Sequence, residues 1–153
     1  ELRQVLERHG LQPRYLEFEV TEEALAQNPE ETRKQLRLLR NLGVRVALDD
    51  FGSGACSLSY LRDLELDTLK IDRHLIARLP HSSRDAALVR NVIDLCKQYG
   101  LLIVAEGVET VAQYEWLQAH GCEYVQGFLV ARPMIAEEVI DFVQPFDWNA
   151  LSL

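Results

Sequence analysis

The sequence predicts an α/β fold, an incomplete (β/α)8 TIM-like barrel of which about five β/α units are present. Three observations predict it. Short apolar runs rich in β-branched residues alternate with helical segments, typical capping residues bound the helices, and polar side chains follow nearly every apolar run. Strict alternation of strand and helix implies right-handed crossovers and a parallel sheet. No composition shift marks a linker, so the 153 residues are expected to form a single domain.

Start and stop signals bound the predicted helices. Asn28 is a predicted N-cap, Pro29 stands at the first helical position, and Gly43 supplies the stop. Gly100 and Gly121 end two further helices in the same way. In chain order the predicted helices cover residues 28–43, 57–62, 83–99, 110–121 and 136–143.

The apolar runs between these helices are the predicted strands, at residues 16–20, 44–48, 68–71, 102–105 and 124–128. Polar side chains lie at or just past the carboxyl end of every run: Glu19, Asp49, Asp50, Lys70, Asp72, Glu106, Glu109 and Gln126. A doubly wound sheet gathers such groups at one crevice, whereas in a barrel every strand contributes to one ring. The pattern therefore favours the barrel. A complete barrel has eight strands, so about three strands are expected outside this sequence.

The converging carboxylates predict a site for divalent cations. Four carboxylates at one mouth repel each other and raise one another's pKa unless cations neutralise them. No His or Cys lies at the strand ends, and all-oxygen ligands select Mg²⁺ or Mn²⁺ over zinc. Adjacent Asp49 and Asp50 can reach two ions about 3.5 to 4 Å apart, as two-metal phosphodiester hydrolysis requires. Taken alone, an Asp-Asp pair also fits an N-cap beside a solvated neighbour.

The aspartates are followed directly by a loop of Phe51, Gly52, Ser53 and Gly54. Two glycines around a hydroxyl allow the backbone to approach a phosphate or to form a hinge that orders with metal, and a plain turn fits equally well. Lys70 is expected to point inward, because the apolar Leu69 and Ile71 occupy the opposite face. A charged lysine suits orienting or polarising a water. The alternative, a Schiff base in an aldolase-like barrel, needs a lowered pKa, which nearby carboxylates oppose.

Charge and cysteine usage limit the partners and the compartment. The net charge of −8 argues against binding to a nucleic-acid duplex, because Lys and Arg contacts with phosphates dominate such affinity. The three cysteines are odd in number and lack Cys-x-x-Cys spacing, which argues against a disulfide framework. The longest apolar stretches, such as residues 101–105, are too short to span a bilayer. We therefore expect a cytoplasmic location, free or on the cytoplasmic side of a membrane-tethered protein.

Five motifs follow one another along nearly the whole chain: Glu19-Val20-Thr21-Glu22, Asp49-Asp50-Phe51-Gly52-Ser53-Gly54, Leu69-Lys70-Ile71-Asp72, Ala105-Glu106-Gly107-Val108-Glu109-Thr110 and Gln126-Gly127-Phe128. In this order they closely resemble the motifs of the EAL family of cyclic-di-GMP phosphodiesterases. The family fold is a modified (β/α)8 barrel with one antiparallel strand. The resemblance implies hydrolysis of cyclic di-GMP to linear pGpG with two Mg²⁺ or Mn²⁺ ions, in bacterial second-messenger signalling.

The resemblance also implies roles for single residues. Those that look like metal ligands are Glu19, Asp49, Asp50 and Glu106. Lys70 resembles the residue that holds or activates the nucleophilic water, and Glu109 is grouped with it in catalysis. Glu22 resembles the glutamate that braces the loop after Asp50. The residues that look as if they order water, metal shell or substrate at the inner mouth are Asp72, Glu109 and Gln126.

Two departures from the family pattern bear on activity. The Glu-Ala-Leu motif and a metal-binding asparagine lie upstream of Glu1, so residues 1–153 are expected to be the C-terminal portion of a single EAL-type barrel domain, inactive alone. In the loop, Ala55-Cys56 replaces an aromatic residue and a serine, which is expected to loosen the loop or a dimer contact. The implied partners are cyclic di-GMP, a second copy in a homodimer, and upstream sensory or diguanylate cyclase domains. The alternative is a receptor that binds cyclic di-GMP without cleaving it; the intact carboxylates favour the enzyme.

Overall fold

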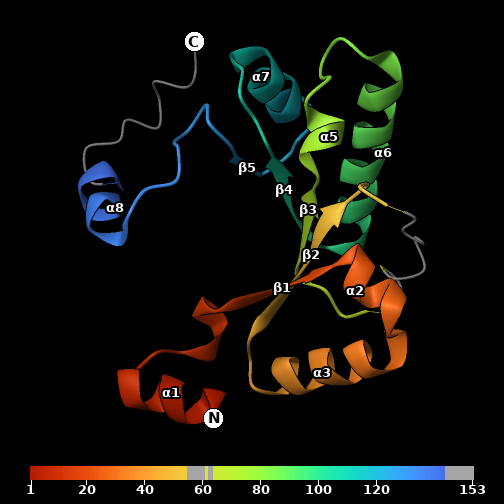
Figure 1. The fold of residues 1–153 in the computed structure, drawn as a ribbon. Coiled ribbons are helices and arrows are strands. Elements are labelled where there is room, and N and C mark those ends of the chain that lie inside the picture. The colour runs from red at the N-terminus through yellow and green to blue at the C-terminus, as the bar shows by residue number, and fades with distance from the viewer. Residues whose placement is uncertain (55–60, 62–63, 144–153) are drawn as a thin grey trace.

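The computed structural model describes residues 1–54, 61 and 64–143, which fold around a five-stranded parallel sheet (Figure 1). The strands are β1 Glu17–Thr21, β2 Arg45–Phe51, β3 Thr68–Ile71, β4 Leu102–Glu106 and β5 Tyr124–Gln126. Each strand pairs in parallel with the next in chain order. An order without reversal is that of a barrel wall, not of a doubly wound sheet. The predicted α/β class and incomplete barrel are confirmed.

The helices in the described residues are α1 Leu2–His9, the 3-10 helix η1 Pro13–Tyr15, α2 Glu22–Gln27, α3 Pro29–Asn41, α5 Arg73–Ile76, α6 Ser83–Tyr99, α7 Val111–Ala119 and α8 Ala136–Val143. Four predicted helices are confirmed as α3, α6, α7 and α8. The helix predicted at residues 57–62 lies outside the described residues. Elements α1, η1, α2 and α5 have no counterpart in the sequence prediction. Within this part of the chain, no helix is long and apolar enough to cross a membrane.

The capping residues explain where the long helices begin and end. Helix α6 ends at Gly100, which adopts a left-handed conformation with φ of 69° as the prediction requires. Helix α7 opens with a reciprocal capping box between Thr110 and Gln113. Helix α3 has Pro29 at its start, but the side chain of its N-cap, Asn28, makes no capping hydrogen bond. The predicted boundary is therefore right although the predicted side-chain cap is absent.

Alternation along the strands gives the sheet an apolar face and a polar face. The apolar face carries fully buried residues, namely Val46, Leu48, Leu69, Ile71, Ile103 and Ala105. They share one hydrophobic core with Val89, Ile93 and Cys96 of α6. The polar face carries Glu17, Glu19, Asp49, Thr68, Lys70 and Glu106. Packing against the helices thus uses one face, and the other is left for charged side chains.

Candidate metal centre

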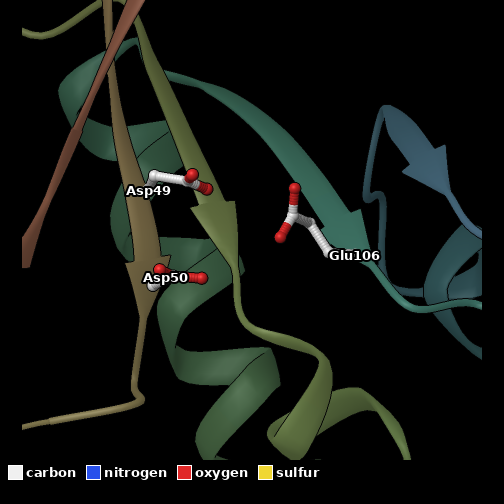
Figure 2. Close-up of side chains that lie close together, drawn as sticks. All are labelled: Asp49, Asp50 and Glu106. Carbon is white, nitrogen blue, oxygen red and sulfur yellow. The ribbon is translucent and has the colours of Figure 1, made fainter.

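Three carboxylates gather on the polar face near the carboxyl end of the sheet (Figure 2). Asp49 and Asp50 come from β2, and Glu106 is the last residue of β4. One oxygen atom from each lies within 4.8 Å of the other two. In Figure 2, Asp49 and Asp50 extend from the same side of β2 toward Glu106. Such a cluster matches the oxygen ligands that hard divalent cations prefer.

A β-bulge lets the two adjacent aspartates share one face. The β2–β3 register runs from Leu48 opposite Leu69 directly to Phe51 opposite Ile71, so two aspartates stand where one residue is expected. Asp50 has a φ of 54°, the only positive φ of a non-glycine residue in the described chain. Regular alternation would place one carboxylate on the apolar face. The strand was predicted to end at residue 48, but β2 continues to Phe51, so both aspartates lie inside the strand rather than just past its end.

Lys70 joins side chains of three other strands. Its Nζ lies 2.6 Å from Oε1 of Glu19 on β1, 2.7 Å from Oε1 of Glu106 on β4, and 3.2 Å from Oδ1 of Asp49 on β2. The lysine side chain is 9% exposed, and its neighbours Leu69 and Ile71 are fully buried on the apolar face. Lys70 thus points to the polar face, as its flanking residues predict. Glu19 is half exposed and contacts the lysine from the rim of the cluster.

The charges of this cluster do not balance. Burial alone would lower the pKa of Lys70, but the close contacts of its Nζ with the carboxylates of Glu106, Glu19 and Asp49 outweigh this effect and raise the pKa above its ordinary value. Lys70 is therefore a cation, which disfavours Schiff-base chemistry. Desolvation, followed by the charges of neighbouring carboxylates such as Asp49, raises the pKa of Asp50 against the opposing effect of Lys70.

Within the described residues, the buried Oδ1 of Asp49 has no hydrogen-bond partner, and its 3.2 Å contact with Nζ of Lys70 is an ion pair. One lysine does not neutralise the four carboxylates around it. A buried, under-satisfied carboxylate oxygen among like charges suits a divalent cation. The residues present therefore fit the metal ions that the sequence predicts.

The segment after Asp50 is held by a hydrogen bond to Glu22. The backbone N–H of Gly52 donates a 3.0 Å hydrogen bond to Oε1 of Glu22, which is 5% exposed in the first turn of α2. Gly52 has a φ of 97°, and a Cβ there would lie 2.4 Å from Cδ1 of Leu75. A turn and close packing therefore account for this glycine. Phe51, predicted in the loop, is instead the last residue of β2 and is buried in the core.

An open cleft of about 560 Å³ lies beside the carboxylates. Its lining includes Asp50, Ser53, Asp72, Arg73, His74, Glu106, Glu109, Gln126 and Phe128. Asp72 is also the N-cap of α5: its Oδ1 accepts from the backbone N–H of His74 at 2.8 Å and lies 2.6 Å from that residue's Nδ1. Arg73 and His74 were not predicted as site residues, and Phe128 was noted only as part of the fifth motif. Their position next to Asp72 and Gln126 in the chain is the signal that could have found them.

The walls of the cleft formed after β4 and β5 interlock through their backbones. The N–H of Val108 donates to the carbonyl of Gln126 at 3.1 Å, and the N–H of Leu129 donates to the carbonyl of Val108 at 3.0 Å. A Cβ on Gly127 would lie 2.1 Å from the carbonyl oxygen of Val108. Only a glycine fits this approach. The close contact between the two segments brings Gln126 and Glu109 to the same cleft, although 16 residues lie between them in the chain.

The structure therefore arranges the predicted site residues in two groups. The first is the carboxylate and lysine cluster of Glu19, Asp49, Asp50, Lys70 and Glu106. The second lines the adjoining cleft and consists of Asp72, Glu109, Gln126 and Ser53. Glu22 belongs to neither group; it accepts a hydrogen bond from the backbone N–H of Gly52, in the segment after Asp50. The replacement at residues 55 and 56 lies outside the described residues.

Comparisons with known proteins identify the family of the chain. The model of the EAL domain family matches residues 1–133. Cyclic di-GMP phosphodiesterase NbdA of Pseudomonas aeruginosa is 43% identical over 150 residues, which are 98% of this chain and 19% of that protein. The bifunctional diguanylate cyclase/cyclic di-GMP phosphodiesterase MucR of the same organism is 45% identical over 139 residues, 91% of this chain and 20% of that protein. The chain thus spans about a fifth of the length of the curated relatives it matches.

Solved structures give the same result. The MucR phosphodiesterase in complex with c-di-GMP has a TM-score of 0.83 and 46% identity, and the match covers 90% of this chain and 56% of that one. Klebsiella pneumoniae BlrP1 with manganese and cyclic di-GMP has a TM-score of 0.82 and 39% identity, covering 86% of this chain and 34% of that one. Fold and site define a partial (β/α) barrel with an acidic mouth. The chain belongs to the EAL domain family.

Proposed function

We propose that the domain to which this chain belongs hydrolyses cyclic di-GMP to linear pGpG with two Mg²⁺ or Mn²⁺ ions. The observation that carries the proposal is the convergence of Asp49, Asp50 and Glu106, whose oxygens lie within 4.8 Å of one another beside a cleft. Relatives named cyclic di-GMP phosphodiesterases support the substrate, and the manganese complex of BlrP1 supports a divalent ion. Residues 1–153 would be the C-terminal portion of a single EAL domain.

The residues would divide the work as follows. Asp49, Asp50 and Glu106, with Glu19 at the rim, would hold the ions. When bound, the ions would supply an activated water and neutralise charge on the scissile phosphate and the leaving oxygen. Lys70, held as a cation by the carboxylates, would orient the attacking water.

The cleft residues would act on the substrate. Glu109 would assist Lys70 in catalysis, and Asp72 and Gln126 would order water or substrate along the cleft. Glu22 would hold the loop after Asp50 in place through its hydrogen bond to the N–H of Gly52. Each of these groups comes from a different strand end, so hydrolysis would depend on the register of the whole sheet.

The setting of the domain is also a proposal. We infer a cytoplasmic location, a homodimer, and upstream sensory or diguanylate cyclase domains. MucR, which carries both activities in its name, supports the last of these. The −8 net charge supports a small phosphate-bearing substrate met through cations rather than a nucleic-acid duplex.

The test is hydrolysis by the protein that contains the complete domain. With Mn²⁺ or Mg²⁺, nucleotide chromatography should detect pGpG, and Asp49→Asn should abolish its formation. Asp94→Asn, which makes the same change at an exposed position of α6, should leave the rate unchanged. Undiminished cleavage by Asp49→Asn would refute the metal assignment. Tight binding of cyclic di-GMP by the unmodified protein without any pGpG would identify a receptor instead.

A further inference from the structure

Gln113 is a buried polar residue with more contacts than its helix start requires. It is 5% exposed and is the third residue of α7. Its backbone N–H donates to Oγ1 of Thr110 at 3.3 Å, and its side-chain Oε1 accepts from the N–H of Thr110 at 2.9 Å. This reciprocal pair is a capping box, and it accounts for the beginning of the helix.

Two further hydrogen bonds of Gln113 reach other parts of the molecule. Its Oε1 also accepts from the N–H of Glu109 at 2.8 Å, and its Nε2 donates to the carbonyl of Ile76 at 3.2 Å. Ile76 is the last residue of α5 and lies 37 residues earlier in the chain. The opposite amide orientation would set Nε2 against two N–H donors, so the network determines which atom is which.

These contacts connect two walls of the cleft. Glu109 lies in the segment after β4, and α5 follows β3 with Asp72 as its N-cap; both residues line the cleft. The same two segments pack closely at Gly107, where a Cβ would lie 2.5 Å from Cβ of Arg73. The amide of Gln113 joins them a second time. Loss of the amide would leave the two walls held by packing at Gly107.

We propose that Gln113 is a positioning residue that ties the segment after β4 to α5 and thereby sets the separation of the Glu109 and Asp72 walls of the cleft. It does not touch the reacting atoms. It acts through the backbone of Glu109 on one side and that of Ile76 on the other. The expected effect on hydrolysis rests on the proposed function, whereas the tie between the two segments does not.

A near-isosteric change separates the tie from the capping box. In Gln113→Glu, one carboxylate oxygen keeps both acceptor contacts with Glu109 and Thr110. The other oxygen replaces the donor to the Ile76 carbonyl, so two acceptors face each other at about the former distance. Gln113→Ala removes both sets of contacts. The control is Gln118→Glu, which introduces the same charge at an exposed position of the same helix.

The measurements use the protein that contains the complete domain. Gln113→Glu is expected to lower kcat about 10- to 100-fold, as loss of a positioning hydrogen bond does elsewhere, with KM changed less than about threefold. Hydrogen exchange in peptides covering residues 72–80 should become faster, and Gln118→Glu should change neither quantity. Gln113→Ala should lose at least as much kcat as Gln113→Glu.

Two results would overturn the proposal: wild-type kcat in Gln113→Glu, or unchanged exchange at residues 72–80. A purely structural role would lower the melting temperature and leave kcat intact when assayed well below it. If the unmodified protein does not cleave cyclic di-GMP, the proposed function fails and exchange alone decides the tie. Faster exchange in Gln113→Glu than in Gln118→Glu would then support it, and equal exchange would refute it.

Discussion

Replacing Lys70 with methionine removes the cation that Glu19, Asp49 and Glu106 share. Methionine keeps much of the apolar stem and loses the charge. Asp49 and Glu106 are 18% and 17% exposed, so their charges remain largely buried and face each other. Removing one partner from a buried charge network costs about 3–5 kcal/mol. At about 2–4 °C per kcal/mol for a domain of 150–250 residues, the melting temperature should fall by about 6–20 °C without metal.

Two conditions should reverse this loss. Saturating Mn²⁺ should restore most of the melting temperature, because a bound cation replaces the missing charge and stabilises the folded state. Acid should also diminish the difference, because the penalty needs ionised carboxylates. The stability penalty of Lys70→Met is complete at neutral pH and disappears as the pH falls and the carboxylates are protonated. Asp50 should be protonated first, because burial and neighbouring charges raise its pKa.

Thermal denaturation of the protein that contains the complete domain, with and without Mn²⁺, is the assay. The control is Lys34→Met, because Lys34 is 70% exposed and its Nζ lies 3.9 Å from Glu31 on the same helix. Such a surface pair contributes about 0–1 kcal/mol. A Lys70→Met melting temperature within about 2 °C of wild type in the absence of metal would refute the electrostatic reasoning. A large loss that Mn²⁺ leaves unchanged would refute the metal site.

Two further predictions concern packing and thiol chemistry. Gly127→Ala should cost about 1–3 kcal/mol, seen as a lower melting temperature, because the added Cβ would lie 2.1 Å from the Val108 carbonyl oxygen. The control is Gly54→Ala, whose added Cβ would come no closer than 3.5 Å to another atom, Oε2 of Glu22; it should cost less, and equal losses would contradict the close approach at Gly127. Burial raises the pKa of Cys122 to about 11 and that of Cys96 to about 12, so both are thiols at pH 8. At pH 8, iodoacetamide should label Cys122 about 100-fold more slowly in the folded protein than in the protein unfolded by urea, as measured by peptide mass spectrometry. The labelling rate of the folded protein should rise with pH up to about 11. Equal labelling rates in the folded and unfolded protein would disprove the raised pKa.

The regular elements were predictable because their signals are local. Helix α6 ends at Gly100 and α7 opens at Thr110, where glycine and a capping box mark the boundaries in the sequence itself. The short helices α2 and α5, with six and four residues, are too short to show a repeating apolar pattern of helical period. Their N-caps lie at strand ends: Thr21 is the last residue of β1, and Asp72 directly follows β3. Polar residues at these positions have the same appearance as strand-end site residues, so nothing in the sequence separates the two roles.

The geometry of the site was less predictable because it depends on register between distant segments. Flanking apolar residues suffice to predict that Lys70 points inward, but its contact with Glu19 spans 51 residues of sequence. The bulge at Asp49 and Asp50 is a property of the β2–β3 pairing. Without it, alternation would separate the two carboxylates. The contacts of Gln113 were missed for the same reason, because a capping box alone explains its position in the chain.

The arrangement of the two sheet faces explains how so many charges are accommodated at one mouth. Hydrophobic packing with α6 uses the apolar face, so residues of the polar face are free of that requirement. The resulting carboxylate repulsion is offset in the metal-free state by Lys70, which also competes electrostatically with any cation at Asp49 and Glu106. Stability and metal affinity are therefore opposed at this residue. Lys70→Met should bind Mn²⁺ more tightly than the unmodified protein, although it should be less stable without the ion. Isothermal titration can measure the difference in Mn²⁺ affinity. Weaker Mn²⁺ binding by Lys70→Met would show that Lys70 supports the ions rather than competing with them.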